Sequence, residues 1–186
     1  MGKAAVVAIV VVLVRVGAGV RPARAESDRD IFVSDEWKVS LELPTGWNWT
    51  DQQTYPGILV SAVHRGGGKG RMTLAVQRLV AGGPTTLREY VERSRKTLLA
   101  IGFQGGRISS HPSGALILDA TAPNRTLSVR QAYFVFIDTA YILTLSAPLT
   151  TVRSYGRAFD DTLRRMIASV KNRPAETPAA AGAPPP

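Results

Sequence analysis

Apolar and polar residues alternate over several short stretches of the chain, and each stretch predicts a β-strand. In residues 37–44, WKVSLELP, the apolar residues Trp37, Val39, Leu41 and Leu43 are separated by polar ones. A period of two is typical of a strand with one buried face. Further strand-like stretches rich in Val, Leu and Ile cover residues 31–33, 57–64, 71–80, 115–121, 126–137 and 141–148.

Two longer stretches have the period of an amphipathic helix. In residues 82–102, Thr86 is the expected N-cap, Glu89 three residues later completes a capping box, and Gly102 ends the helix. The second stretch covers residues 150–171 and carries one apolar stripe of Val152, Tyr155, Phe159, Leu163, Met166, Ile167 and Val170.

The order of these elements predicts an α+β fold. Strands joined by short connections pair mainly antiparallel, and two one-sided helices must bury their apolar stripes against the sheet. We therefore expect a mainly antiparallel sheet of about six strands flanked by two principal helices. Residues 26–171 form this single domain.

The first 25 residues have the pattern of a secretory signal peptide. Lys3 precedes an unbroken apolar run over residues 4–14, and the small residues Ala23 and Ala25 fit a cleavage site. An uncleaved membrane anchor is the alternative, but Arg15 ends the run well short of the about 20 apolar residues that span a bilayer. The pattern predicts an exported protein, either periplasmic or secreted, with no membrane span after cleavage.

The other end of the chain is rich in alanine and proline. Residues 172–186, NRPAETPAAAGAPPP, contain no large apolar side chain. Such a segment cannot bury enough apolar surface to offset its ordering entropy, so we predict a disordered tail.

Composition excludes some chemistries and disfavours others. The chain has no cysteine, which excludes disulfides, thiolate metal sites and lipoprotein anchoring. Its formal net charge is +9, and loss of residues 1–25 would leave 19 basic and 14 acidic residues, a net charge of +5. Export and the absence of a dense Lys/Arg cluster disfavour nucleic acid as a partner.

The glycine-rich stretch HRGGGKGR, residues 64–71, raises the question of a phosphate-binding loop. A Walker loop requires Ser or Thr after its lysine and a helix next in the chain. Here Gly70 follows Lys69, and the next stretch alternates as a strand. The pattern favours a hairpin turn whose tip carries Arg65, Lys69 and Arg71.

The layout resembles the PsbP-like superfamily of small α/β/α sandwiches, which includes PsbP, DcrB-type and Mog-type proteins. Residues 37–49, WKVSLELPTGWNW, are similar to a family strand that ends in a Pro-x-Gly-Trp turn. Residues 131–169 are similar to its hairpin, Tyr-x-Leu-Thr strand and closing helix. The resemblance implies a non-enzymatic binding, assembly or stabilising role and supplies no shared catalytic set.

A search for catalytic residues gives no marked site. His64 and His111 are the two histidines, and neither lies at metal-ligand spacing from another His or acid. Asp119 or Asp138 could complete a Ser-His-Asp set, but no G-x-S-x-G elbow is present. We expect no metal and no cofactor. The alternatives are a hydrolase that uses His111 or His64 as its base, and a carrier of an apolar ligand between sheet and helix.

The remaining candidates for a binding surface are aromatic and cationic. Trp47 and Trp49 follow Pro44 and, with Tyr55, could form a platform for a partner. The alternative, which we favour, is that Trp47 packs into the core and Trp49 covers its rim. The candidate binding residues are therefore Trp47, Trp49, Tyr55, Arg65, Lys69 and Arg71. The expected partner is another envelope or secreted protein.

Overall fold

The structure is a computed structural model, and it describes residues 31–50, 57–66, 69–79, 83 and 86–172. The predicted signal peptide, Tyr55 and residues 173–186 lie outside these ranges. Within them, no helix is long and apolar enough to cross a membrane.

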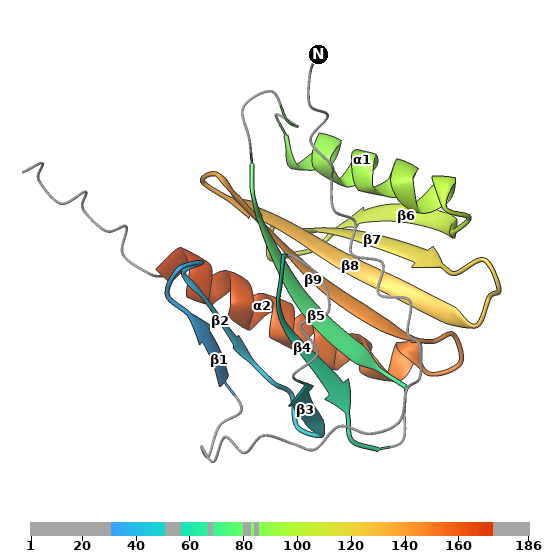
Figure 1. Cartoon of the computed structure of the whole chain (residues 1–186), viewed down its shortest axis with the longest axis horizontal. Helices are drawn as coiled ribbons and strands as arrows, with labels where there is room; N and C mark the ends of the chain where they lie inside the picture. The colour runs from blue at the N-terminus through green and yellow to red at the C-terminus, as the bar shows by residue number, and fades with distance from the viewer. Residues whose placement is uncertain (1–30, 51–56, 67–68, 80–82, 84–85, 173–186) are drawn as a thin grey trace, which may run out of the picture.

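A seven-stranded antiparallel sheet forms the body of the protein, in the order β3-β4-β5-β9-β8-β7-β6 (Figure 1). A separate hairpin, β1-β2, lies beside it. The bounds are β1 Ile31–Ser34, β2 Val39–Glu42, β3 Trp47–Thr50, β4 Ile58–His64, β5 Arg71–Arg78, β6 Gln104–Ser110, β7 Leu116–Thr121, β8 Leu127–Phe136 and β9 Thr139–Pro148. The α+β fold with an antiparallel sheet and two principal helices is confirmed.

Two helices cover opposite faces of this sheet (Figure 1). Helix α1, Leu87–Ala100, packs on β6, β7 and β8, while α2, Gly156–Asn172, packs on the other face with β2 and β8. Each face has its own apolar cluster. The larger one, on the α2 side, includes Leu74, Leu143, Phe159 and Leu163, all fully buried.

The predicted caps of α1 are present. Thr86 has extended backbone and its hydroxyl accepts a hydrogen bond from the Glu89 amide at 3.1 Å. Gly102 follows the helix with φ +91°, a conformation that glycine adopts without steric cost. The capping box and the glycine therefore set both ends of this helix, as the sequence indicates.

The second helix begins later than predicted. Residues 152–155 form a short 3₁₀ turn, Val152–Tyr155, and the α-helix starts at Gly156 and ends at Asn172. Val152 and Tyr155 still point inward and pack against the core, which is why the apolar stripe seemed continuous. Asn172, which the sequence assigned to the tail, is the last residue of this helix.

Two strands of the main sheet are missing from the prediction, and β1 and β2 do not belong to that sheet. Strand β3, WNWT, is only four residues long. Strand β6, QGGRISS, has two adjacent glycines and one large apolar residue. Both lie at the edges of the sheet, where burial imposes little alternation.

Candidate functional site

The candidate surface is built on β3, the edge strand that pairs only with β4 in the main sheet. A turn closed by the Trp47 amide donating to the Pro44 carbonyl (3.2 Å) starts this strand. Gly46 has φ +86° in this turn. Strand alternation then places Trp47 and Trp49 on the face that α2 covers and Asn48 on the opposite face.

Trp47 is buried and belongs to the core. It is 2% exposed, and its ring meets the edges of His64 and Tyr155 at centroid distances of 5.5 Å each. Such edge-to-face pairs stabilise an aromatic cluster beyond the burial of area. A side chain with no accessible surface cannot form a platform, so the hypothesis that Trp47 contacts a partner is corrected.

Trp49 is half-buried at the rim of the same cluster, as the favoured interpretation held. Its ring lies 6.2 Å from that of Phe32 in β1, which holds it in place. Beside Phe32, Ile31 and Val33 are exposed at 42% and 53%. Trp49 therefore contacts the Phe32 face of the β1-β2 hairpin, whereas Ile31 and Val33, which alternate with Phe32, project on its opposite face.

The glycine-rich segment 64–71 is the hairpin connection between β4 and β5, as predicted. The His64 amide donates to Gly70 (3.0 Å), and the Arg65 amide donates to Gly46 (2.8 Å). A Cβ on Gly70 would lie 2.8 Å from the Tyr155 ring, so this glycine allows the hairpin to pack on the aromatic cluster. Gly70 thus serves packing, and strand β5 rather than a phosphate-binding helix follows the segment.

The three cationic side chains of this hairpin lie in different surroundings. Arg65 is exposed, and its Nε donates to the Asn48 side chain of β3. Lys69 is exposed. Arg71 pairs with Val63 at the start of β5, so it projects on the face opposite Trp49. Burial lowers the pKa of Arg71, because desolvation disfavours the charged guanidinium.

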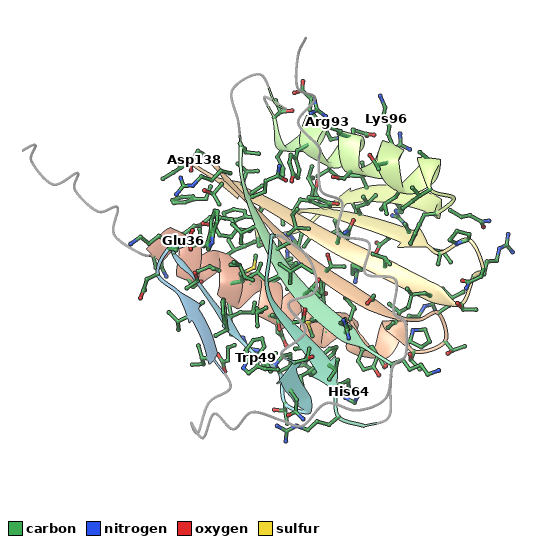
Figure 2. All side chains as sticks on the ribbon, viewed as in Figure 1. Glu36, Trp49, His64, Arg93, Lys96 and Asp138 are labelled. Atoms are coloured by element: carbon green, nitrogen blue, oxygen red, sulfur yellow. The ribbon has the colours of Figure 1, made fainter. Side chains whose placement is uncertain are left out.

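The structure therefore places Trp49 and Arg65 at the same end of the sheet but on different faces of β3, because Arg65 bonds to Asn48, which the sequence search missed and which lies opposite Trp49. Lys69 lies on the same hairpin as Arg65. Figure 2 shows the Trp49 and His64 side chains at this end. The only sequence signal for Asn48 was its place between two tryptophans, and its partner Arg65 is distant in sequence.

His111 lies in the β6-β7 turn and does have a serine within reach, as the hydrolase hypothesis required. Its Nδ1 is 2.8 Å from Ser113 Oγ, and its Nε2 is 3.9 Å from Asp160 Oδ1 of α2. However, the Ser113 amide also donates to Nδ1, at 3.2 Å. Because an amide can only donate, that nitrogen is an acceptor already engaged by the turn.

The backbone around Ser113 gives the same picture of a structural turn. The Gly114 amide donates to the His111 carbonyl at 3.0 Å, and the His111 amide donates to Ala115 at 2.9 Å. The amides of Ser113 and Gly114 are therefore engaged within the turn and are not directed at a developing oxyanion. We interpret the Ser113–His111 contact as part of a structural turn. His111 also places this turn against Asp160 of α2.

Side chains fill the space between α1 and the sheet, where an apolar ligand was an alternative. Tyr90, Val91 and Leu98 of α1 are at most 3% exposed. The Tyr90 ring packs edge-on against Tyr133 of β8 at 5.8 Å. This packing gives the carrier hypothesis no support. Among the described residues, no group of three His, Asp or Glu side chains could hold a metal ion.

Comparison with known proteins identifies the fold. No protein-family model matches the sequence, and no curated protein matches it by sequence. The structure is similar to that of cyanobacterial PsbP (CyanoP) from Synechocystis, with TM-score 0.54 and 12% identity over 79% of this chain and 96% of that chain. It is also similar to the Ran-binding protein Mog1p of Saccharomyces cerevisiae, with TM-score 0.55 and 12% identity over 76% and 94%. The resemblance noted from the sequence is confirmed at the level of fold.

Proposed function

We propose that this chain, which has the PsbP-like fold, is an exported, non-enzymatic accessory protein that binds another protein of the envelope or the secreted fraction. The binding surface is Trp49, Arg65 and Lys69, here called the Trp49 surface. The observation that carries the proposal is the half-exposed Trp49 on the edge strand β3, to which Arg65 of the adjoining hairpin is hydrogen-bonded through Asn48.

Composition and position favour this surface as an interface. Tryptophan and arginine are enriched among the residues that dominate binding energies at interfaces. Trp49 is half-exposed on the edge strand β3, and Arg65 and Lys69 add positive charge on the adjoining hairpin. A partner that fits has an apolar patch bordered by carboxylates.

The structural neighbours support a binding role. One of them, Mog1p, is described as a Ran-binding protein. The catalytic alternative has no comparable support, because the groups around His111 are engaged within its turn. The apolar-carrier alternative is opposed by the packing between α1 and the sheet.

The test of the proposal begins with crosslinking in the native envelope and identification of the captured protein. The affinity between the two purified proteins is then measured. We expect Trp49→Ala to weaken binding by about tenfold or more, which corresponds to loss of an interface hot spot. The double variant Arg65→Glu/Lys69→Glu should slow association and reduce its dependence on salt.

The matched control is Arg93→Glu/Lys96→Glu on the outer face of α1. It makes the same change of charge on two exposed residues, and Figure 2 shows both on the helix far from Trp49. Equal effects of the two double variants would attribute binding to net charge alone. Unchanged binding by Trp49→Ala would refute the Trp49 surface.

A further inference from the structure

A second surface lies at the corner formed by the β1-β2 turn, the end of β5 and the β8-β9 turn. The Arg78 guanidinium at the end of β5 lies over the Trp37 ring, 5.5 Å from its centroid. The Tyr141 hydroxyl of β9 donates to the Trp37 carbonyl at 2.9 Å. Figure 2 shows Glu36 and Asp138 at this corner. We call it the Ile137 corner, after the residue at its tip.

Ile137 is unfavourable for the folded chain in two ways. It lies in the two-residue connection between β8 and β9 with φ +57°, and it is 80% exposed. The left-handed conformation brings the Cβ of an L-residue close to a carbonyl oxygen, and a β-branched side chain in it is an outlier. Such hairpin positions normally carry Asn, Asp or Gly. Ile137 contributes little packing in return, because most of its side chain faces water.

The residues around Ile137 hold this conformation firmly. The Thr139 hydroxyl donates to Asp138 at 2.9 Å, and Arg78 forms an ion pair with Asp138 at 3.2 Å. The Leu79 amide donates to the Asp138 carbonyl at 2.7 Å. The Thr139 hydrogen bond, with Arg78, holds the pKa of Asp138 below its ordinary value. A strained residue supported in this way is typical of a functional position.

Aromatic side chains and balanced charges surround the tip. The rings of Phe134 and Phe136 stack at 6.4 Å and 14°, and Lys171 of α2 lies over the Phe134 ring at 5.4 Å. Glu36 and Asp138 offset Arg78 and Lys171 in charge. The corner therefore presents one branched aliphatic side chain on a nearly neutral, aromatic base, unlike the cationic Trp49 surface.

From this geometry we infer that the Ile137 corner is a second protein-docking site, at which Ile137 inserts into an apolar pocket of a partner protein. The inference rests on the proposed binding function but uses a different surface. The rim is nearly neutral, so the pocket of the partner should carry no excess of positive or negative charge, because a charged pocket would find no complementary net charge here. A second copy of the chain is disfavoured as the occupant, because the net charge, +5 after loss of residues 1–25, makes copies repel each other.

The test places a photocrosslinking benzoylphenylalanine at position 137 in the full chain, expressed in the source cells. The control position is Arg125, which is also exposed and has φ +54° in the β7-β8 turn. The captured protein is identified and purified, and its affinity is measured for the wild type, Ile137→Asn and Arg125→Asn.

Asparagine tolerates the left-handed conformation, so both variants should be at least as stable as the wild type, and Ile137→Asn should raise Tm by about 2–4 °C. We expect Ile137→Asn alone to weaken binding by at least about tenfold. Binding to this corner should change little between low and high salt, because the docking group is uncharged.

Three results would overturn the inference: equal capture at positions 137 and 125, a crosslinked species composed of two copies of this chain, or unchanged affinity of Ile137→Asn. The Trp49 surface is tested by separate variants. Loss of binding by Trp49→Ala with no effect of Ile137→Asn would therefore reject the second site and keep the first.

Discussion

At the scale of single residues, the charged cluster on the α2 side of β7 and β8 shows burial competing with charge pairing. Asp119 pairs across the strands with Arg107 and Arg130. Its Oδ1 lies 3.1 Å from Arg130 Nε. Desolvation nevertheless outweighs the attraction of Arg130, and the pKa of Asp119 is raised above its ordinary value.

This raised pKa predicts a pH dependence of stability. Between the unfolded and the folded pKa, the native state binds more protons than the unfolded state, so the contribution of Asp119 falls as pH rises through this window. We expect the stability of the wild type relative to Asp119→Asn to decrease as pH increases from the unfolded value near 3.8 through the folded pKa. Urea unfolding at a series of pH values measures this difference.

Asp138 is the matched control for this measurement, because the Thr139 hydroxyl and Arg78 lower its pKa. Its contribution is present above the unfolded pKa and is lost as pH falls through the folded one. The stability of the wild type relative to Asp138→Asn should therefore increase with pH. A difference with the same sign of slope for both aspartates would contradict our account of Asp119.

Residue chemistry also explains why the sequence did not reveal the Ile137 corner. An isoleucine near the end of an apolar strand is usually read as part of the strand, and the prediction extended that strand to residue 137. The left-handed conformation arises because Phe136 pairs with Thr139, which leaves Ile137 and Asp138 to turn the chain. Register of this kind depends on the partner strand and is not encoded in one residue.

At the scale of elements, local patterns predicted what local interactions determine. The Thr86 cap fixed the start of α1, and in β9 the alternation of Leu143 and Leu145 with Thr144 and Ser146 fixed its two faces. The adjacency of β5 and β9 joins segments far apart in the chain and was not predictable from periodicity. The edge strands β3 and β6 were missed for the reason given above.

A hydrogen-bonded contact with Ser169 of α2 is among those that join the β1-β2 hairpin to the rest of the protein. Ser169 of α2 accepts a hydrogen bond from the Ser40 amide at 3.0 Å, and its hydroxyl lies 3.1 Å from the Ser40 carbonyl and 2.8 Å from that of Met166. Ser40 is in β2 and faces Val33 of β1 on its other side. The Ser169 hydroxyl thus satisfies the amide and the carbonyl of Ser40 in β2.

We expect Ser169→Ala to lower the free energy of unfolding by about 1–3 kcal/mol, because it leaves half-buried backbone groups of Ser40 without their partner. Thr97→Ala on α1 is the control. The Thr97 hydroxyl donates to the Arg93 carbonyl one turn earlier (3.2 Å), but on an exposed face. Urea unfolding gives the energies, and hydrogen exchange should show faster exchange at the Ser40 amide. Equal effects of the two variants would show that Ser169 has no special role.

At the scale of the whole molecule, each of the two helices covers one face of the sheet and closes one apolar cluster. The cluster on the α1 side draws its buried residues from positions 75–142, and the cluster on the α2 side from positions 39–170. Among the described residues, both clusters therefore lie within the predicted domain. The rings of Trp47, His64 and Tyr155 contact one another. They connect β3, the 64–71 hairpin and the turn before α2, so the segments that carry the Trp49 surface are packed directly on the core.

Because the described core residues all lie between residues 39 and 170, we predict that a chain of residues 26–172 folds as stably as one of residues 26–186. Calorimetry should give the same Tm for both, within about 2 °C, since the extra segment buries no large apolar side chain.

A chain of residues 26–155 is the control. It lacks α2, and with it Phe159, Leu163, Met166 and Ile167, whose loss removes one wall of the larger core. That chain should show no cooperative transition, because each such residue contributes about 2–5 kcal/mol. A marked loss of Tm in the 26–172 chain would mean that residues 173–186 pack on the domain.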